Sequence, residues 1–107
     1  MMKFYWWQSL PWLPWRVVCF VNAADEVPDS LPRKGAVIVG TEKHPKWLAF
    51  DCPCRRRHRI MLNLDVHRKP RWKVLGKSRL TVHPSVDSLV EDVRCHYFLR
   101  NGRVEWT

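Results

Sequence analysis

The stretch "DCPCRRRHR", residues 51–59, sets two cysteines one proline apart and follows them with three arginines and a histidine. Structural zinc needs four Cys or His ligands, and two of them commonly come from one tight turn. With one residue between them, Cys52 and Cys54 project to the same side of an extended chain, and Pro53 restrains the backbone between them. The usual ligand spacing is about two to four residues. The stretch predicts a zinc-ribbon-like knuckle with a tighter turn than usual.

The remaining ligands must come from elsewhere in the chain. Cys95 offers a third thiolate on a separate predicted strand, which would let a metal join two sheet edges. His96 follows it directly, but neighbours on a regular strand point to opposite faces, so both could bind one metal only through a bulge or a bend. His58, four residues after Cys54, needs no such distortion. Geometry favours His58 as the fourth ligand, and His96 stays open.

Composition supports metal ligation over other uses of the cysteines. The chain has 107 residues and four cysteines, which suits one domain with a modest core. Nothing in the sequence indicates secretion, so we expect a cytoplasmic protein with reduced thiols and a structural Zn²⁺. Cys19, in the apolar run "RVVCFV", is expected to be a core thiol. A redox pair would need a C-x-x-C spacing at a helix N-terminus, which is absent.

The first fifteen residues differ from the rest, because four of the seven tryptophans lie there. Pro11, Pro14 and Arg16 interrupt the apolar run, so neither a signal peptide nor a membrane span of about 20 residues is expected. We predict an aromatic N-terminal arm over residues 1–15 and a β-rich metal-binding domain over residues 16–107. The arm packs on its own domain or on a partner.

Short β-type runs separated by turn residues recur along the chain, without a sustained helical period. We predict an all-β fold, or a β-rich one with a short helical turn, arranged as a small sheet or sandwich. The segments "ADEVPDSLP" and "SVDSLVED" are where a helical turn fits. The dipeptide "NG" at residues 101–102 predicts a hairpin. The predicted strands cover residues 16–21, 35–40, 46–51, 58–64, 71–75, 79–83, 95–100 and 103–107.

The chain is strongly basic, with a formal net charge of +9 at pH 7. Residues 55–79 contain ten lysines and arginines and one acid, Asp65. Such a stripe could track phosphates, but it is equally the solvated face of a sheet. The residues predicted to form a nucleic-acid or partner surface are Arg55, Arg56, Arg57, Arg59, Arg71 and Lys73.

Several runs taken together resemble domain-of-unknown-function family 6527, a family of small bacterial proteins. They are "KWLAFDCPCRRRHRIMLNL", "KPRW", "LTVHPSV" and "CHYFLRNGRVEW", over about the last two-thirds of the chain. The resemblance implies metal binding through Cys52 and Cys54 and through Cys95 and His96. It also implies a gene neighbourhood of ubiquitin-like modifiers and their conjugating enzymes, linked to phage defence. Many relatives continue the motif as CPCGCG, where this chain has three arginines.

The sequence thus predicts a non-enzymatic, zinc-stabilised module that binds a protein partner in a bacterial ubiquitin-like conjugation or anti-phage operon. No catalytic zinc signature, nucleophile elbow or phosphate-binding glycine loop is present in the sequence. The alternative is a zinc-containing nucleic-acid-binding module that uses the basic residues 55–79.

Overall fold

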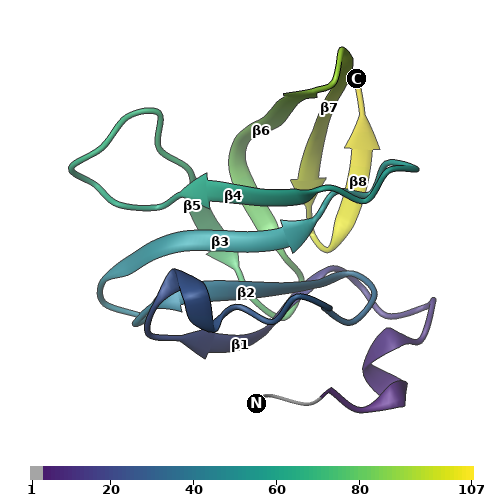
Figure 1. The fold of residues 1–107 in the computed structure, drawn as a ribbon, viewed down its shortest axis with the longest axis horizontal. Helices are drawn as coiled ribbons and strands as arrows, with labels where there is room; N and C mark the ends of the chain where they lie inside the picture. Colours follow the sequence, from purple (N-terminus) through teal and green to yellow (C-terminus); the bar gives the residue numbers. More distant parts are fainter. Residues whose placement is uncertain (1–3) are drawn as a thin grey trace.

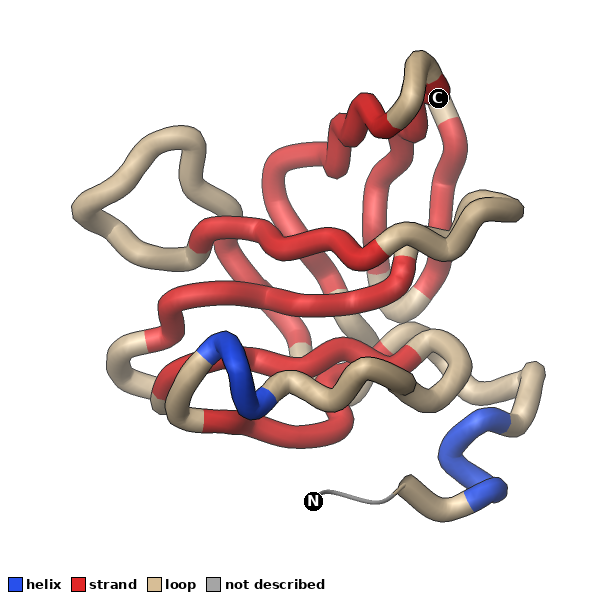
Figure 2. Tube along the Cα trace, viewed as in Figure 1, coloured by secondary structure: helices blue, strands red, loops and turns tan. Residues whose placement is uncertain are grey.

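The apolar runs of the sequence form two four-stranded sheets in the computed structural model, which describes residues 4–107 (Figures 1 and 2). Two short 3-10 helices, η1 and η2, precede β1 and follow it. The elements are η1 Trp6–Ser9, β1 Arg16–Val21, η2 Ala24–Glu26, β2 Gly35–Gly40, β3 Pro45–Asp51, β4 Arg59–Asn63, β5 Lys73–Gly76, β6 Thr81–Val90, β7 Val93–Arg100 and β8 Arg103–Trp106.

The first sheet has the order β1-β2-β3-β4, with β1 parallel to β2 and the other neighbours antiparallel. The run "GAVIVG" of β2 lies inside this sheet and is buried on both faces, which explains why it is apolar without alternation. Ile38 faces the main core, whereas Val37 and Val39 pack with Val21 in a smaller cluster on the other face.

The second sheet, β5-β6-β7-β8, is built from consecutive antiparallel hairpins. Asn101 and Gly102 have positive φ angles of 49° and 76°, as the type I′ turn predicted from "NG" requires. Glu91 and Asp92 also have positive φ, 49° and 65°, and make an equally tight turn between β6 and β7. These two turns set the register of the three strands that carry the site.

The main core lies between the two sheets, where β4 crosses in front of the β6–β8 strands (Figure 1). Leu48 and Phe50 of β3 face Val86 of β6 and Tyr97 of β7 across this core, all of them buried. Cys52 and Cys95 belong to the same cluster of buried residues. The cysteines therefore sit where the two sheets meet.

The all-β prediction is confirmed, and the main difference concerns "SVDSLVED". This segment continues β6 to Val90 and then turns, because Val86, Ser88 and Val90 pair with β7. The other segment suggested for a helical turn contains η2. Within residues 4–107, no helix is long and apolar enough to cross a membrane.

The N-terminal segment joins the sheets at Trp15. The Trp15 N–H donates to Gly102 O at 3.0 Å, Leu80 N–H donates to Trp15 O at 2.7 Å, and the indole packs edge-on against Phe50. Trp12 is by contrast 74% exposed. Residues 1–3 of the expected arm lie outside the described part, and the boundary after residue 15 stays a prediction.

Replacing Trp15 by alanine should destabilise the fold by about 3–5 kcal/mol, because the indole is only 6% exposed and fills the core between the sheets. Trp12→Ala is the matched control and should change the free energy of unfolding by less than about 0.5 kcal/mol. Urea unfolding of both variants measures the difference. Similar losses of unfolding free energy in the two variants would contradict the prediction, because they would mean that Trp12 contributes as much to the packing as Trp15.

Candidate functional site

The predicted knuckle is the loop that joins β3 to β4. Its two ends are held together by the Cys52 N–H, which donates to His58 O at 2.9 Å. Inside it, the Arg57 N–H donates to Cys54 O at 3.2 Å, and Arg57 adopts a positive φ of 48°. This tight turn brings the side chains of Cys52, Cys54 and His58 to one side.

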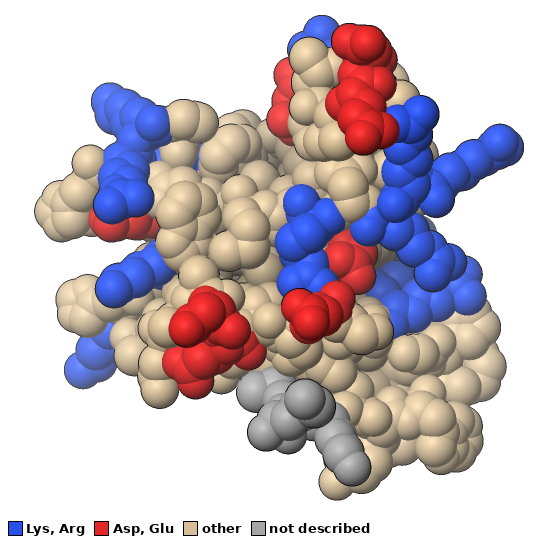
Figure 3. All heavy atoms as spheres, in the orientation of Figure 1, with Lys and Arg blue, Asp and Glu red and all other residues tan. Residues whose placement is uncertain are grey.

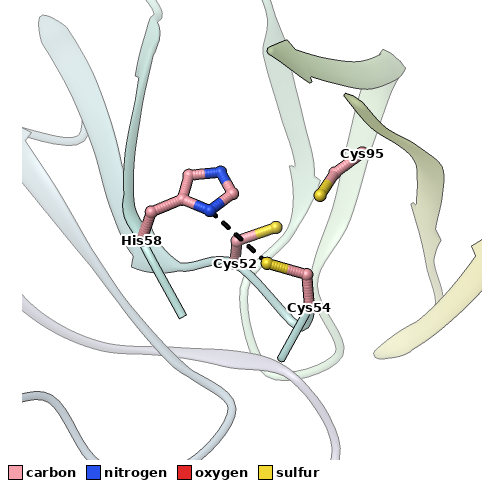
Figure 4. Close-up of side chains that lie close together, drawn as sticks. All are labelled: Cys52, Cys54, His58 and Cys95. Atoms are coloured by element: carbon pink, nitrogen blue, oxygen red, sulfur yellow. Dashed lines mark hydrogen bonds between the residues drawn. The ribbon is translucent and has the colours of Figure 1, made fainter. Parts of the chain in front are cut away.

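Cys95 of β7 completes a group of four ligand atoms that all lie within 4.8 Å of one another (Figure 4). The three other members come from the knuckle, so the cluster links one sheet to the other. Inside the cluster, Cys54 Sγ lies 3.4 Å from His58 Nδ1. Three thiols and an imidazole form a donor set that could hold a metal ion, since this is one of the common tetrahedral combinations.

Two neighbouring side chains hold the ligands in place. The Tyr97 hydroxyl lies 3.4 Å from Cys52 Sγ, and Ser88 Oγ lies 3.2 Å from His58 Nε2. With His58 Nδ1 directed at the cluster, its Nε2–H donates to Ser88. Ligating histidines in metal sites usually have such a partner on the second nitrogen.

The electrostatics of the cluster also suit a cation. Burial raises the pKa of Cys95 to about 12, and hydrogen bonds that its S–H donates to the sulfurs of Cys54 and Cys52 add to the shift. Burial likewise raises the pKa of Cys52. Burial acts in the same direction on Cys54, but hydrogen bonds from the backbone N–H groups of Arg56 and Arg57 and from the Cys52 and Cys95 thiols together outweigh it and lower the pKa of that thiol. Without a cation, the three thiols cannot all ionise.

His96, the other predicted ligand, lies outside this cluster, because it points to the opposite face of the sheet from Cys95. Its Nε2 lies 3.0 Å from Ser85 Oγ, and its Nδ1 lies 2.8 Å from Thr107 Oγ1. Ser85 and His96 are both half-buried. Their separation falls in the range of about 2.6–3.2 Å expected for a nucleophile and its general base.

The contacts of Thr107 allow the tautomer of His96 that a general base needs. If the Thr107 hydroxyl donates to the backbone carbonyl of His96, 3.3 Å away, its lone pair can accept the proton of Nδ1, 2.8 Å away. In that tautomer Nε2 is unprotonated and can accept the Ser85 hydroxyl proton. This is the arrangement that a general base requires.

A carboxylate lies beside this pair. Asp87 stands opposite His96 in the β6–β7 ladder, and Arg94 binds both of its oxygens, at 2.9 and 2.6 Å. The hydrogen bond from Arg94 lowers the pKa of Asp87, and the charge of His96 contributes in the same direction. Asp87 is therefore ionised near the imidazole at neutral pH.

The predicted basic surface is divided by contacts within the chain. Arg56 pairs with Glu91, Arg59 pairs with Asp51, and Arg71 donates to Leu64 O. Basic side chains lie in several groups separated by acidic and uncharged ones on the face in Figure 3. The exposed members of the predicted surface, apart from Arg56, are Arg55, Arg57 and Lys73.

Sequence analysis missed Ser85 as a candidate site residue. A serine and a histidine eleven positions apart match no motif, and they meet only because the turn at Glu91 and Asp92 fixes the register of β6 and β7. Had "VEDV" been recognised as a two-residue hairpin, strand pairing would have put Asp87 opposite His96 and Ser85 nearby.

A protein-family model matches residues 23–107. The matching model is described as "Bacterial ubiquitination-like system serine protease (BubE)". No curated protein and no solved structure matches the chain. The match supports the link to bacterial ubiquitin-like conjugation that the resemblance implied, under a different family name.

The metal-free protein should lose stability as the pH rises above about 9. Below the ordinary thiol pKa of 9.0, folded and unfolded chains both hold the Cys95 proton; from there up to about 12, only the folded chain holds it. Unfolding therefore becomes more favourable through this window. Urea unfolding of metal-free protein at several pH values, with Cys95→Ala as control, measures the slope. An equal slope in the variant would contradict the prediction.

Proposed function

Because the chain belongs to the family described as serine proteases of bacterial ubiquitination-like systems, we propose that it is a serine hydrolase of such a system. Ser85 is the nucleophile and His96 its general base. The observation that carries the proposal is the 3.0 Å contact between Ser85 Oγ and His96 Nε2, together with the Thr107 hydroxyl 2.8 Å from Nδ1, which can hold the ring in the tautomer with Nε2 unprotonated.

The proposed reaction follows from this geometry. Ser85 Oγ attacks a substrate carbonyl carbon, and its proton moves to His96 Nε2. His96 then gives that proton to the leaving nitrogen as the C–N bond breaks, which leaves an acyl group on Ser85. A water molecule, deprotonated by His96, hydrolyses the ester, and the proton returns to Ser85.

Thr107 and Asp87 support the base in different ways. The Thr107 hydroxyl orients the ring through Nδ1. The ionised Asp87 carboxylate favours the imidazolium that forms during attack, although Arg94 shares its charge. Thr107 is thus a neutral positioning residue, in the place where many hydrolases have a carboxylate.

We propose further that Cys52, Cys54, His58 and Cys95 hold a structural Zn²⁺. The support is the donor set, its confinement within 4.8 Å and the second contact of His58 to Ser88. When bound, the ion would neutralise the thiolates and hold the knuckle against β7. Its four ligands leave no position for substrate, so the chemistry stays with Ser85 and His96.

The family description points to a protein substrate, which we place among the ubiquitin-like proteins of such a system or their conjugates. The sequence analysis predicts a non-catalytic interaction module instead, but the Ser85–His96 pair favours catalysis. Neither the comparisons nor the contacts among residues 4–107 support the nucleic-acid alternative.

A fluorophosphonate should label Ser85, with displacement of fluoride by Oγ, because the probe reacts with serines that a base activates. Intact-mass and peptide mass spectrometry should place the added group on Ser85 and show none in Ser85→Ala. The control is Ser78→Ala, since Ser78 is exposed on a turn away from the sheets. Labelling of another serine, or of none, would refute the assignment.

Thr107→Val should slow this labelling about tenfold or more, since loss of one hydrogen bond to a polar side chain costs about 1–2 kcal/mol and frees the ring to rotate. Thr107→Ser keeps the hydroxyl and should restore most of the rate. The pH dependence of labelling distinguishes a positioning role from a structural one, because loss of the contact at His96 Nδ1 should change the shape of the pH profile as well as the rate. Equal rates in the two variants would remove Thr107 from the mechanism.

A further inference from the structure

The strand that carries Ser85 has an unpaired edge. On one side of β6, β5 pairs only with residues 81–83. On the other side, β7 pairs with β6 as far as Val90. Residues 84–90 of β6 therefore have a strand on one side only, and Figure 1 shows no strand beside this half of β6 opposite β7.

The register shows which backbone groups face this edge. Val90 and Val93 flank the two-residue turn. Residues in this position form a hydrogen-bonded pair, in which each backbone N–H donates to the other residue's C=O. Hydrogen-bonded and non-hydrogen-bonded residue pairs alternate along an antiparallel ladder, so the backbone N–H and C=O groups of Ser88 and Val86 also point toward β7. The N–H and C=O groups of Asp87 and Leu89 then face the open edge, and neither residue makes a backbone hydrogen bond outside the β6–β7 ladder among the residues described.

This edge ends beside the reactive pair, where the carbonyl of Ser85 accepts the Trp72 indole N–H at 3.1 Å. Ser85 lies two residues before Asp87 on the same strand, and Asp87 stands opposite His96. A strand paired with the edge would run about 4.8 Å from β6. Its peptide planes would lie close to the plane of the sheet, so its carbonyl carbons would be open to attack from the face on which Ser85 meets His96.

An exposed side chain near the end of the edge also suits a peptide. Leu89 is 70% exposed and lies one residue before the end of β6. It is one of the most exposed large apolar side chains of the second sheet. Exposed strand edges with apolar side chains favour pairing with another chain unless something covers them.

We propose that the substrate binds as an extended strand added to the β6 edge at Asp87 and Leu89, with an apolar side chain against Leu89 and its scissile carbonyl at Ser85. This inference rests on the proposed hydrolase function. Backbone hydrogen bonds supply most of the binding, as in other cases of strand addition. The substrate must therefore offer a flexible, extended segment, such as a chain terminus, and not a folded surface.

The test uses a quenched fluorogenic octapeptide selected from a random library by cleavage with the wild-type protein. Each amide of this peptide is then N-methylated in turn. In an antiparallel or parallel pairing only every second residue directs its N–H to the partner strand, so methylation should reduce kcat/KM about tenfold or more at alternate positions near the scissile bond and little at those between. Uniform tolerance, or losses without the two-residue period, would overturn the inference.

Two protein variants give an independent measurement. Leu89→Pro removes the outward N–H and should raise KM for the peptide about tenfold, whereas Leu89→Ala keeps the N–H and should lose less. Thermal melting checks that both variants fold. If Leu89→Pro is unfolded, the methylation series alone decides; if it is folded and its KM is unchanged, the edge is not the binding site.

Fluorophosphonate labelling of the wild-type protein separates the two claims. If Ser85 is not labelled, the hydrolase function fails, and the inference fails with it. If Ser85 is labelled but no library peptide is cleaved, the function stands and strand addition is overturned, because main-chain pairing accepts many sequences.

Discussion

The contact between the knuckle and β7 is the constraint on which the rest of the structure depends. Cys52, Cys54 and His58 come from one sheet, and Cys95 comes from the other, so their meeting fixes how the two sheets face each other. A chain of 107 residues buries a core of modest size, and a metal bound at such a site contributes its binding free energy directly to folding. The same contact holds the hairpin β6–β7 in place.

This hairpin serves two chemical purposes because strand side chains alternate between faces. On the inner face, Ser88 contacts His58 and Tyr97 contacts Cys52, so both support the cysteine cluster. On the outer face, Ser85 contacts His96. Each face thus has its own serine–histidine contact, Ser88 with His58 on the inner face and Ser85 with His96 on the outer face. The hairpin contributes Cys95 to the cluster and both members of the Ser85–His96 pair.

Sequence patterns predicted the β-rich fold, the NG hairpin and the three clustered cysteines, because strand propensity, turn chemistry and ligand spacing are local properties. Strand alternation favoured His58 as the fourth ligand, whereas the family resemblance favoured His96; in the structure His58 joins the cluster and His96 faces away from Cys95. Ser85 was not predicted, since its partner is eleven residues away and the intervening turn uses Glu91 and Asp92 at positive φ. Residues other than Asn and Gly in such turns give a weak signal.

We propose a hydrolase whose reactive pair is held in place by a remote cluster of ligands; the family match, the cluster and the Ser85–His96 contact support this proposal. The most direct test is to measure zinc content and Ser85 labelling on the same sample while a chelator withdraws the metal. The account predicts one zinc ion per chain at the start and loss of labelling in parallel with loss of zinc. Metal-free protein that stays folded and is labelled at Ser85 as fast as before would contradict it.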